Sequence, residues 1–383
     1  MLVRGGRAFI DGVVRDADIL LEGARIARIA EAGELAADQV VDAAGCIVAP
    51  GFIDVHFHGC VGRDFCDGTA QAIADIARYE ASRGVTAICP ATMTYPEERL
   101  AAIMDAAAAF APADDEAALV GVNMEGPFIS PNKVGAQNPA YVQHADASML
   151  RRLQKRAGGL VKIVDVAPEE PGALDFIADV AGEVRVSLAH TCATYDDARA
   201  AFEAGARQLT HLFNAMPGLD HREPGPIAAA AEHAHVTPEL IADGVHVHPA
   251  MVRLAFALFG ADRMILISDS MRACGSGDGT FDLGGQDVHV SGNRATLADG
   301  TIAGSVTDLA ACVRVAVTEM GIALEDALLA ASANPARALG LASQRGSIAP
   351  GYMADLVLLD NDLEVSRVIL RGKPLGGNRE SDR

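Results

Sequence analysis

The sequence has no run of apolar residues long enough to cross a membrane. A spanning helix needs about 18 or more apolar residues in succession, and because no such run occurs we expect no membrane contact. The amino terminus also lacks the hydrophobic core of a secretion signal, which predicts a cytoplasmic protein. The 7 cysteines are scattered and include no Cys-x-x-Cys pair. An odd, scattered set favours free thiols in a reducing compartment over a disulfide framework.

Positive charge is scarce as well. The chain has 31 Lys and Arg against 51 Asp and Glu, a formal net charge of −20. Nucleic-acid backbones select basic surfaces, so this balance argues against a nucleic-acid partner. For the same reason, an anionic substrate would need its own cationic anchor. Of the 383 residues, 50% are hydrophobic and 21% are charged, which is typical of a folded chain with a large core.

Both ends of the chain have the pattern of short β-strands separated by glycine turns. Alternating apolar residues near the amino terminus are interrupted at Asp11-Gly12 and Glu22-Gly23, and similar strands follow residue 353. Neither end has enough apolar area to fold alone. We therefore predict one small β-sandwich domain formed from both termini, residues 1–49 plus 343–383.

Between the ends, residues 50–342 alternate β-rich apolar runs with alanine-rich helical stretches, of which 73–83 and 309–320 have the clearest helical spacing. Eight such βα units predict an α/β fold, a (β/α)8 TIM-like barrel that forms the catalytic domain. The glycine-rich segment 275–304 breaks the alternation and is predicted to be a β-hairpin excursion after the eighth strand. The eight predicted strands are 52–57, 86–90, 119–124, 161–166, 184–189, 208–212, 238–242 and 264–268.

Metal-binding side chains recur where these predicted strands end. In a βα barrel, the carboxyl ends of the strands meet at one face, where reactive groups collect. An unpaired charged or imidazole group after a buried run is costly, and a shared divalent ion removes that cost. Each residue alone has an ordinary structural explanation, such as a hydrogen-bonded core histidine or a salt-bridged glutamate. Together they predict a metal site, and the candidate ligands are His56, His58, Glu125, His190, His211 and Asp269.

Several motifs resemble those of a known family. The opening Pro-Gly-Phe-Ile-Asp-x-His-x-His-Gly at 50–59 is similar to that of the amidohydrolase superfamily. Glu-Gly-Pro-Phe at 125–128 and Thr-His-Leu-Phe-Asn-Ala-Met at 210–216 resemble strings of the N-acetylglucosamine-6-phosphate deacetylases within it. Arg-Glu-Pro-Gly at 222–225 and Ala-Asp-Gly-Val-His at 242–246 extend the resemblance over essentially the whole chain.

The resemblance implies a metal arrangement. Glu125, His190 and His211 would hold the principal ion. Glu125 takes the place of the carboxylated lysine that other members of the superfamily use, and no lysine lies near the end of the fourth predicted strand. His56 and His58, with Glu125 as a bridge, would hold a second ion, so one or two ions are expected per subunit. Histidine and carboxylate ligands suit Zn²⁺ or Fe²⁺, and the sequence does not choose between them.

The implied reaction is hydrolysis of the N-acetyl amide of N-acetylglucosamine 6-phosphate, giving glucosamine 6-phosphate and acetate. Water activated by the metal attacks the amide carbonyl. Asp269 takes a proton from that water and passes one to the leaving amine. His246 polarises the carbonyl and stabilises the oxyanion. Two alternatives stay open: Asp269 as a purely structural ligand, and His248 as the working histidine instead of His246.

Substrate contacts are implied in the same way. Arg222 matches the phosphate-binding arginine of the family, whose guanidinium fork suits phosphate. The backbone N–H groups of Asn214 and Ala215 would assist. In relatives this arginine reaches across a dimer interface, which implies a homodimer; the alternative is a surface ion pair with Glu223. Gln137 falls where some relatives carry a histidine that touches the sugar hydroxyls, so it is a candidate sugar contact.

Three other functions are compatible with parts of this pattern. An N-acetylgalactosamine-6-phosphate deacetylase would use the same machinery and differ in the contact to one hydroxyl group. A cyclic-amide hydrolase or deaminase is disfavoured by the missing carboxylated-lysine candidate and by the Arg222 motif. A non-catalytic scaffold with the same fold would be expected to lose metal ligands, and none is lost here.

Overall fold

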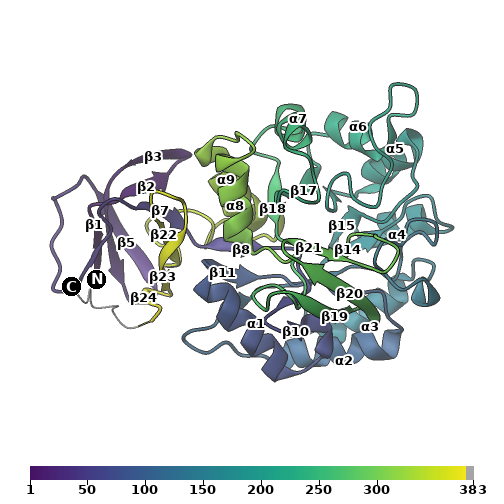
Figure 1. Ribbon diagram of the computed structural model, residues 1–383, viewed down its shortest axis with the longest axis horizontal. Helices are drawn as coiled ribbons and strands as arrows, with labels where there is room; N and C mark the ends of the chain where they lie inside the picture. Colours follow the sequence, from purple (N-terminus) through teal and green to yellow (C-terminus); the bar gives the residue numbers. More distant parts are fainter. Residues whose placement is uncertain (377–383) are drawn as a thin grey trace.

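The computed structural model describes residues 1–376 and has two parts, a βα barrel and a β-sandwich beside it (Figure 1). The barrel consists of parallel strands in the centre with helices around them. This arrangement confirms the predicted fold class. We propose the same division into domains, with the sandwich at 1–49 plus 343–383 and the barrel at 50–342. Residues 377–383 of the predicted carboxyl-terminal segment lie outside the described residues.

Parallel strands form the barrel in two sheets, one of three strands in the order β12-β11-β8 and one of six in the order β13 to β18. Hydrogen bonds join the sheets at both seams: Asn123 N–H donates to Pro90 O (2.9 Å), and Asp269 N–H donates to His56 O (3.0 Å). The predicted third strand is divided between β12 and β13. The strands are β8 (Phe52–Asp54), β11 (Val85–Ile88), β12 (Ala118–Leu119), β13 (Val122–Met124), β14 (Val161–Val166), β15 (Arg185–Leu188), β16 (Gln208–Leu209), β17 (Thr237–Ile241) and β18 (Ile265–Ile267).

Helices cover the outside of the barrel, and their start points follow from local capping. In α1, the Thr69 hydroxyl accepts a hydrogen bond from Ala72 N–H, so the helix begins three residues before the predicted 73. Its buried face includes Ile73 and Ile76, and also Glu80. The helices are α1 (Ala70–Ser82), α2 (Glu97–Ala109), α3 (Ala147–Arg156), α4 (Ala173–Val180), α5 (Tyr195–Ala204), α6 (Gly225–Glu232), α7 (Pro249–Phe259), α8 (Leu309–Thr318), α9 (Leu324–Ala331) and α10 (Ala333–Ala338).

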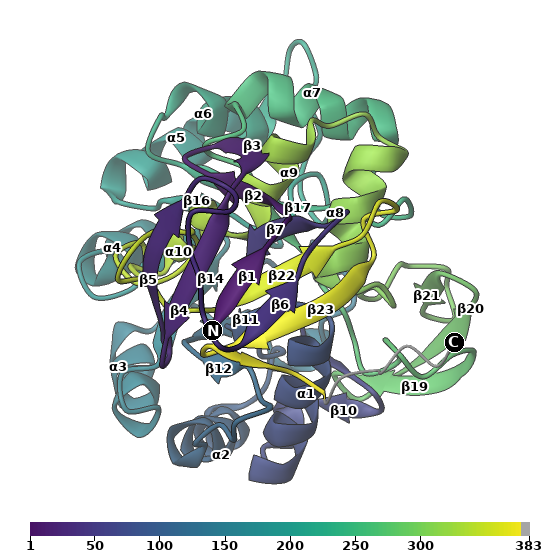
Figure 2. The same ribbon diagram turned by 90° about the vertical axis from the view of Figure 1, so that its left-hand side faces the viewer.

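Strands from both ends of the chain pair in the sandwich (Figure 2). β22 lies antiparallel to β7, with Leu356 opposite Pro50 and Leu359 opposite Ile47. One sheet has the order β5-β4-β1-β6 and the other β24-β23-β22-β7-β2-β3. Apolar residues of both sheets form a core of their own. The strands are β1 (Leu2–Arg4), β2 (Arg7–Ile10), β3 (Val13–Asp16), β4 (Asp18–Glu22), β5 (Arg25–Ala30), β6 (Val40–Asp42), β7 (Ile47–Pro50), β22 (Leu356–Leu359), β23 (Val365–Leu370) and β24 (Lys373–Pro374).

The predicted excursion after the eighth barrel strand is a three-stranded antiparallel sheet, β19 (Gly279–Leu283), β20 (Gln286–Ser291) and β21 (Arg294–Thr296). It lies to one side of the barrel (Figures 1 and 2). The Gln286 side chain donates a hydrogen bond to Ala136 O (2.6 Å), which links this sheet to the loop after β13. The excursion therefore packs beside the carboxyl ends of the barrel strands.

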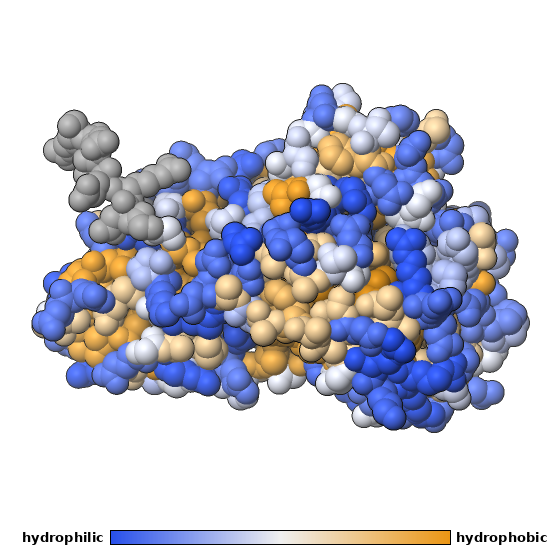
Figure 3. All heavy atoms as spheres, turned by 90° about the horizontal axis from the view of Figure 1, so that it is seen from below, coloured by the Kyte–Doolittle hydropathy of each residue, from blue (hydrophilic) through white to orange (hydrophobic). Residues whose placement is uncertain are grey.

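The surface face seen in Figure 3 is largely hydrophilic, with hydrophobic side chains gathered in separate patches. Within residues 1–376, no helix combines the length and apolar character needed to traverse a bilayer.

Candidate active site

Most of the predicted site residues line one cavity of about 350 Å³. This volume falls in the range of small-molecule sites. Nine of the residues predicted for the site border it: His58, Glu125, Gln137, His190, His211, Asn214, Ala215, His246 and Asp269. His56 lies directly behind this surface and is fully buried.

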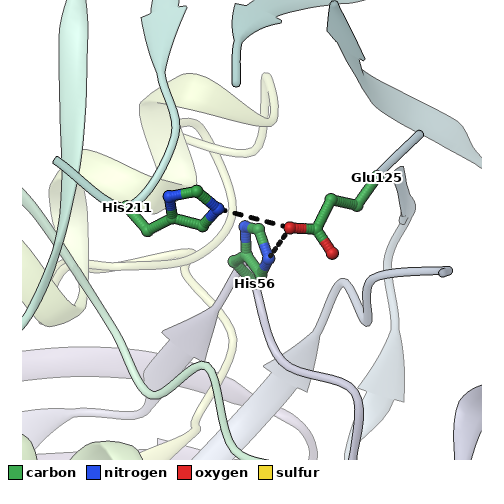
Figure 4. Close-up of side chains that lie close together, drawn as sticks. All are labelled: His56, Glu125 and His211. Carbon is green, nitrogen blue, oxygen red and sulfur yellow. Dashed lines mark hydrogen bonds and ion pairs between the residues drawn. The ribbon is translucent and has the colours of Figure 1, made fainter. Parts of the chain in front are cut away.

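Glu125, just after β13, lies at the centre of the candidate ligands. Its Oε1 is 2.9 Å from His190 Nε2, 3.3 Å from His211 Nε2 and 3.5 Å from His56 Nε2. Figure 4 shows how His56 and His211 converge on this oxygen from different strand ends. The other oxygen, Oε2, is 3.3 Å from His58 Nε2. Glu125 therefore touches the imidazoles of both predicted ion sites.

Two groups of buried side chains have the spacing of metal ligands. One consists of His56, Glu125 and His211, and the other of His56, His58 and Asp269. In each group the ligand atoms lie within 4.8 Å of one another. His56 belongs to both groups. The sequence assigned it to the second ion alone, whereas the geometry places it between the two positions.

These residues fit a divalent cation. The Nε2 atom of His56 is buried and has no hydrogen-bond partner among the described residues. A buried polar atom without a partner is costly, and a metal ion held by either of the two groups would satisfy it. Imidazole nitrogens and carboxylates are donors that transition metals accept. The site thus has the burial and the ligand chemistry of a metal centre.

The far sides of two imidazoles are fixed by backbone carbonyls. His190 Nδ1 lies 3.1 Å from Lys133 O, and His211 Nδ1 lies 3.2 Å from Asn214 O. A carbonyl oxygen only accepts, so Nδ1 carries the proton in both rings. Nε2, which faces Glu125, is then the nitrogen that is available to a metal ion. Such outer hydrogen bonds orient metal-binding histidines.

Three candidate ligands have a left-handed backbone. The φ angle is 44° at His190, 28° at His211 and 49° at Asp269. Residues other than glycine rarely adopt this region, and each instance costs about 1–3 kcal/mol. The surrounding hydrogen bonds and packing must hold these side chains in place. Strain of this kind clusters at functional sites.

Charges within the site favour ionised carboxylates beside charged imidazoles. Burial opposes the charge on His56, but Glu239 and Glu125 outweigh it and raise the pKa of His56 well above its ordinary value. Burial likewise opposes the charge on Glu125, yet the charge of His56 and a hydrogen bond from His190 hold the pKa of Glu125 well below its ordinary value. Glu125 is thus held in its ionised form, which is the form that can bind a cation.

His246 and Asp269 face the cavity beside the metal ligands. His246 Nδ1 lies 2.7 Å from Asp243 Oδ2, and this contact fixes the ring. Burial works against a charged His246, but Asp243 overcomes it and raises the pKa of His246. Asp269 Oδ1 is 3.4 Å from His58 Nε2. Burial acts to raise the pKa of Asp269, but the hydrogen bond with His58 outweighs it, so the pKa is lowered.

Arg222 and His248 are placed differently. Arg222 is exposed, does not line the cavity of its own chain, and makes no ion pair with Glu223 within the described residues. His248 is exposed and caps α7, where its Nδ1 accepts a hydrogen bond from Ala250 N–H (3.1 Å). The geometry therefore favours His246 over His248 as the histidine that meets the substrate.

Sequence reasoning missed two residues. Lys133 is the one lysine or arginine that lines the cavity in the part of the chain that is described. The sequence feature that could have identified Lys133 is a basic residue in the loop that follows the Glu-Gly-Pro-Phe string. Glu239 is a fully buried carboxylate in β17, next to His56. A glutamate inside the apolar run 238–242 was the signal for it.

Comparison with known proteins places this geometry in a family. The sequence profile described as the Amidohydrolase family matches residues 47–375. N-acetylglucosamine-6-phosphate deacetylase of Bacillus subtilis (strain 168) is 37% identical over 344 residues, which cover 88% of this chain and 87% of that protein. N-acetylgalactosamine-6-phosphate deacetylase of Escherichia coli O157:H7 is 36% identical over 329 residues, 85% of this chain and 87% of that protein.

A solved structure is similar along nearly the whole chain. It is the N-acetyl-D-glucosamine-6-phosphate deacetylase of Mycobacterium smegmatis, an aspartate-to-alanine mutant in complex with N-acetyl-D-glucosamine-6-phosphate. The TM-score is 0.91 at 35% sequence identity, and the match covers 98% of each chain.

Proposed function

The chain belongs to the amidohydrolase family, and from this we propose that it hydrolyses N-acetylglucosamine 6-phosphate to glucosamine 6-phosphate and acetate. One observation carries the proposal. Metal-ligand candidates, an ionised carboxylate and a histidine held by a carboxylate all border the same cavity at the carboxyl ends of the barrel strands. Metal-assisted hydrolysis of a linear amide uses these groups together.

We propose Glu125, His190 and His211 as ligands of the principal ion, with His56 and His58 available for a second. A divalent ion, Zn²⁺ or Fe²⁺ with one or two per subunit, would supply Lewis acidity, which polarises an amide carbonyl and lowers the pKa of water. The unpartnered Nε2 of His56 and the spacing of the two ligand groups support this assignment.

Asp269 is proposed as general base and then general acid. Its lowered pKa keeps it ionised at neutral pH, so that it can accept a proton from the attacking water. It then returns a proton to the amine as the C–N bond breaks. His246 is held through Nδ1 by Asp243, which outweighs the effect of burial, raises the pKa of the ring and so favours a protonated Nε2. That Nε2–H can donate a hydrogen bond to the developing oxyanion.

Substrate anchoring is proposed at other residues that line the same cavity. The backbone N–H of Ala215 is available to the phosphate, whereas that of Asn214 already donates to His211 O (2.9 Å). Lys133 offers a cation that a phosphate dianion needs in a chain of net charge −20. Arg222 is proposed to reach the phosphate bound to the partner subunit of a homodimer. Its exposure and its absence from the lining of its own cavity support that role.

Gln137 lines the same cavity and was predicted to touch the sugar. Its amide nitrogen donates to Glu125 Oε2 (2.6 Å), and its oxygen accepts from Thr94 N–H (2.7 Å). We propose that Gln137 holds Glu125 and presents the remainder of its amide to the sugar.

The cellular setting follows from composition. We propose a cytoplasmic enzyme, since the 7 cysteines are free thiols. Its acidic surface favours a small phosphorylated sugar as partner over nucleic acid.

A substrate panel tests the proposed reaction. Acetate release is measured with the 6-phosphates of N-acetylglucosamine and N-acetylgalactosamine and with both unphosphorylated sugars. We expect the highest kcat/KM with N-acetylglucosamine 6-phosphate and weak activity without phosphate. A preference for the galactosamine compound would support the alternative deacetylase activity. Release of no acetate from any of the four compounds would contradict the proposal.

A further inference from the structure

Glu239, in the middle of β17, is fully buried and has no part in the proposed reaction. Its Oε2 lies 2.9 Å from His56 Nδ1 and 3.3 Å from the backbone N–H of His211. One carboxylate oxygen therefore contacts two candidate ligands that come from different strand ends. The contact with His56 lies on the side of the ring away from Nε2 and Glu125.

The same carboxylate is connected to a cation through one glutamine. Gln208, on the neighbouring strand β16, donates its side-chain N–H to Glu239 Oε1. The Gln208 oxygen accepts from Arg185 Nε at 2.5 Å. Arg185, on β15, is held in turn by Thr237 Oγ1 (2.5 Å) and by Arg207 O (3.0 Å). A continuous hydrogen-bonded chain thus runs Arg185, Gln208, Glu239, His56 across adjacent barrel strands.

This chain compensates the buried charge of Glu239. Among the described residues Arg185 makes no direct ion pair with a carboxylate, and it remains charged at neutral pH. Burial and the neighbouring Arg207 lower the pKa of Arg185 to about 10, while Glu239 acts in the opposite direction. Gln208 can donate to the glutamate and accept from the arginine at once, so its amide is oriented by both ends.

The carboxylate also determines the state of His56. A carboxylate only accepts, so the ring must donate Nδ1–H, and Nε2 is the nitrogen that is available to a metal ion. The Asn123 side chain lies 3.3 Å from the same nitrogen but presents its amide nitrogen, which cannot accept. His56 Nε2 points toward Glu125 Oε1, 3.5 Å away, and toward Asp269 Oδ1, 3.9 Å away. The ring is oriented for metal binding.

His56 differs in this respect from the other candidate histidines. His190 and His211 donate Nδ1–H to neutral backbone carbonyls. His58 Nδ1 is buried without a partner in the described part of the chain. A carboxylate behind the ring makes an imidazole a stronger ligand than a carbonyl does. We infer that Arg185, Gln208 and Glu239 form a positioning relay that fixes the tautomer and orientation of His56 for metal binding.

Cobalt binding to the metal-free protein tests the relay. Apoprotein is titrated with Co²⁺, and the visible absorption spectrum reports both affinity and ligand geometry. The His56→Ala variant identifies the part of the signal that depends on His56. We expect Glu239→Gln to weaken the binding of that cobalt by about 10–100-fold and to change its spectrum, since removal of an outer-shell partner has effects of this size.

Two further variants separate the relay from a general structural effect. Ser187→Ala is the matched control, because Ser187 is also buried in the barrel and its side chain bonds, within residues 1–376, only to Thr210 Oγ1 (2.5 Å). It should leave cobalt affinity and spectrum unchanged. Gln208→Met breaks the middle of the relay and should weaken the His56-dependent cobalt in the same direction. It decides the matter if Glu239→Gln fails to fold.

The outcomes are distinct. If Glu239→Gln binds cobalt with the affinity and spectrum of the wild type, the relay is overturned. If Glu239→Gln fails to fold, the same result in Gln208→Met overturns it. Equal weakening in Ser187→Ala would also overturn it. The inference rests on the proposed metal site, which the wild type tests separately: if the wild-type protein binds no cobalt, the metal-dependent function itself fails.

Discussion

The side-chain nitrogen of Gln137 lies 2.6 Å from Oε2 of Glu125 and donates a hydrogen bond to it. The other end of the same amide accepts from Thr94 N–H. Glu125 is thereby held from one side by Gln137 and from the other by the imidazoles of three strand ends. The glutamine that the sequence predicts as a sugar contact is thus also bonded to the central carboxylate of the site.

Replacing Gln137 with leucine should impair the metal site. The change leaves a buried carboxylate oxygen without its donor, which costs about 1–3 kcal/mol. We expect lower metal content after dialysis and a lower kcat, with a smaller change in KM. Gln143→Leu, at an exposed glutamine nearby, is the control. A raised KM with unchanged kcat and metal content would show that Gln137 serves the sugar alone.

Asp269→Asn should abolish most of the activity. The asparagine retains the size of the side chain but cannot take up a proton, so kcat should fall by about 10²–10⁴-fold. Metal content is measured on the same samples, because Asp269 also belongs to a ligand group. Asp262→Asn, at an exposed carboxylate, should behave as wild type. Full activity in Asp269→Asn would exclude Asp269 as general base.

Lys133→Met and Arg222→Met should each raise KM for the phosphorylated sugar. A charge-assisted hydrogen bond contributes about 1.5–3 kcal/mol, equivalent to about 10–100-fold in KM. The unphosphorylated sugar should be little affected, and Lys162→Met, outside this cavity, is the control. The effect of Arg222 should disappear in protein shown by sedimentation to be monomeric. An unchanged KM in either variant would remove that residue from the phosphate site.

Glu80 should make stability fall as the pH rises. Both of its carboxylate oxygens are buried without a partner among the described residues, and burial, followed by the charges of Asp54 and Asp308, raises its pKa well above the ordinary value. Above the ordinary glutamate pKa, the unfolded state has released the proton of Glu80, whereas the folded state still binds it. Stability is full below the ordinary glutamate pKa and declines toward the raised one, by up to about 1.4 kcal/mol per pH unit.

The Glu80→Gln variant should lack this decline and be more stable than wild type at neutral pH. Urea unfolding across the acidic to neutral range measures it, and Glu98→Gln, at an exposed position, is the control. Unfolding curves of wild type and Glu80→Gln that shift with pH in parallel would contradict the assignment.

Much of the fold was predictable because it depends on local patterns in the sequence. Eight apolar runs alternating with helical stretches predicted the barrel, and the ligands at strand ends followed from the position of each polar residue after a run. The contacts that orient those ligands correspond to no local sequence pattern. His56 and Glu239 are 183 residues apart in sequence, and Glu125 and His190 are 65 apart, so these pairings depend on barrel closure. The left-handed backbone of His190, His211 and Asp269 could not be predicted from the sequence either, because tertiary contacts impose it against local preference.

The most direct test of the proposed function is metal removal and restoration in a single protein sample. The protein is stripped with a chelator, and acetate release from N-acetylglucosamine 6-phosphate and metal content are measured before and after Zn²⁺ or Fe²⁺ is returned. We predict that acetate release disappears with the metal and returns in proportion to the ion bound. Full activity in metal-free protein, or no acetate release from fully loaded protein, would contradict the proposed function.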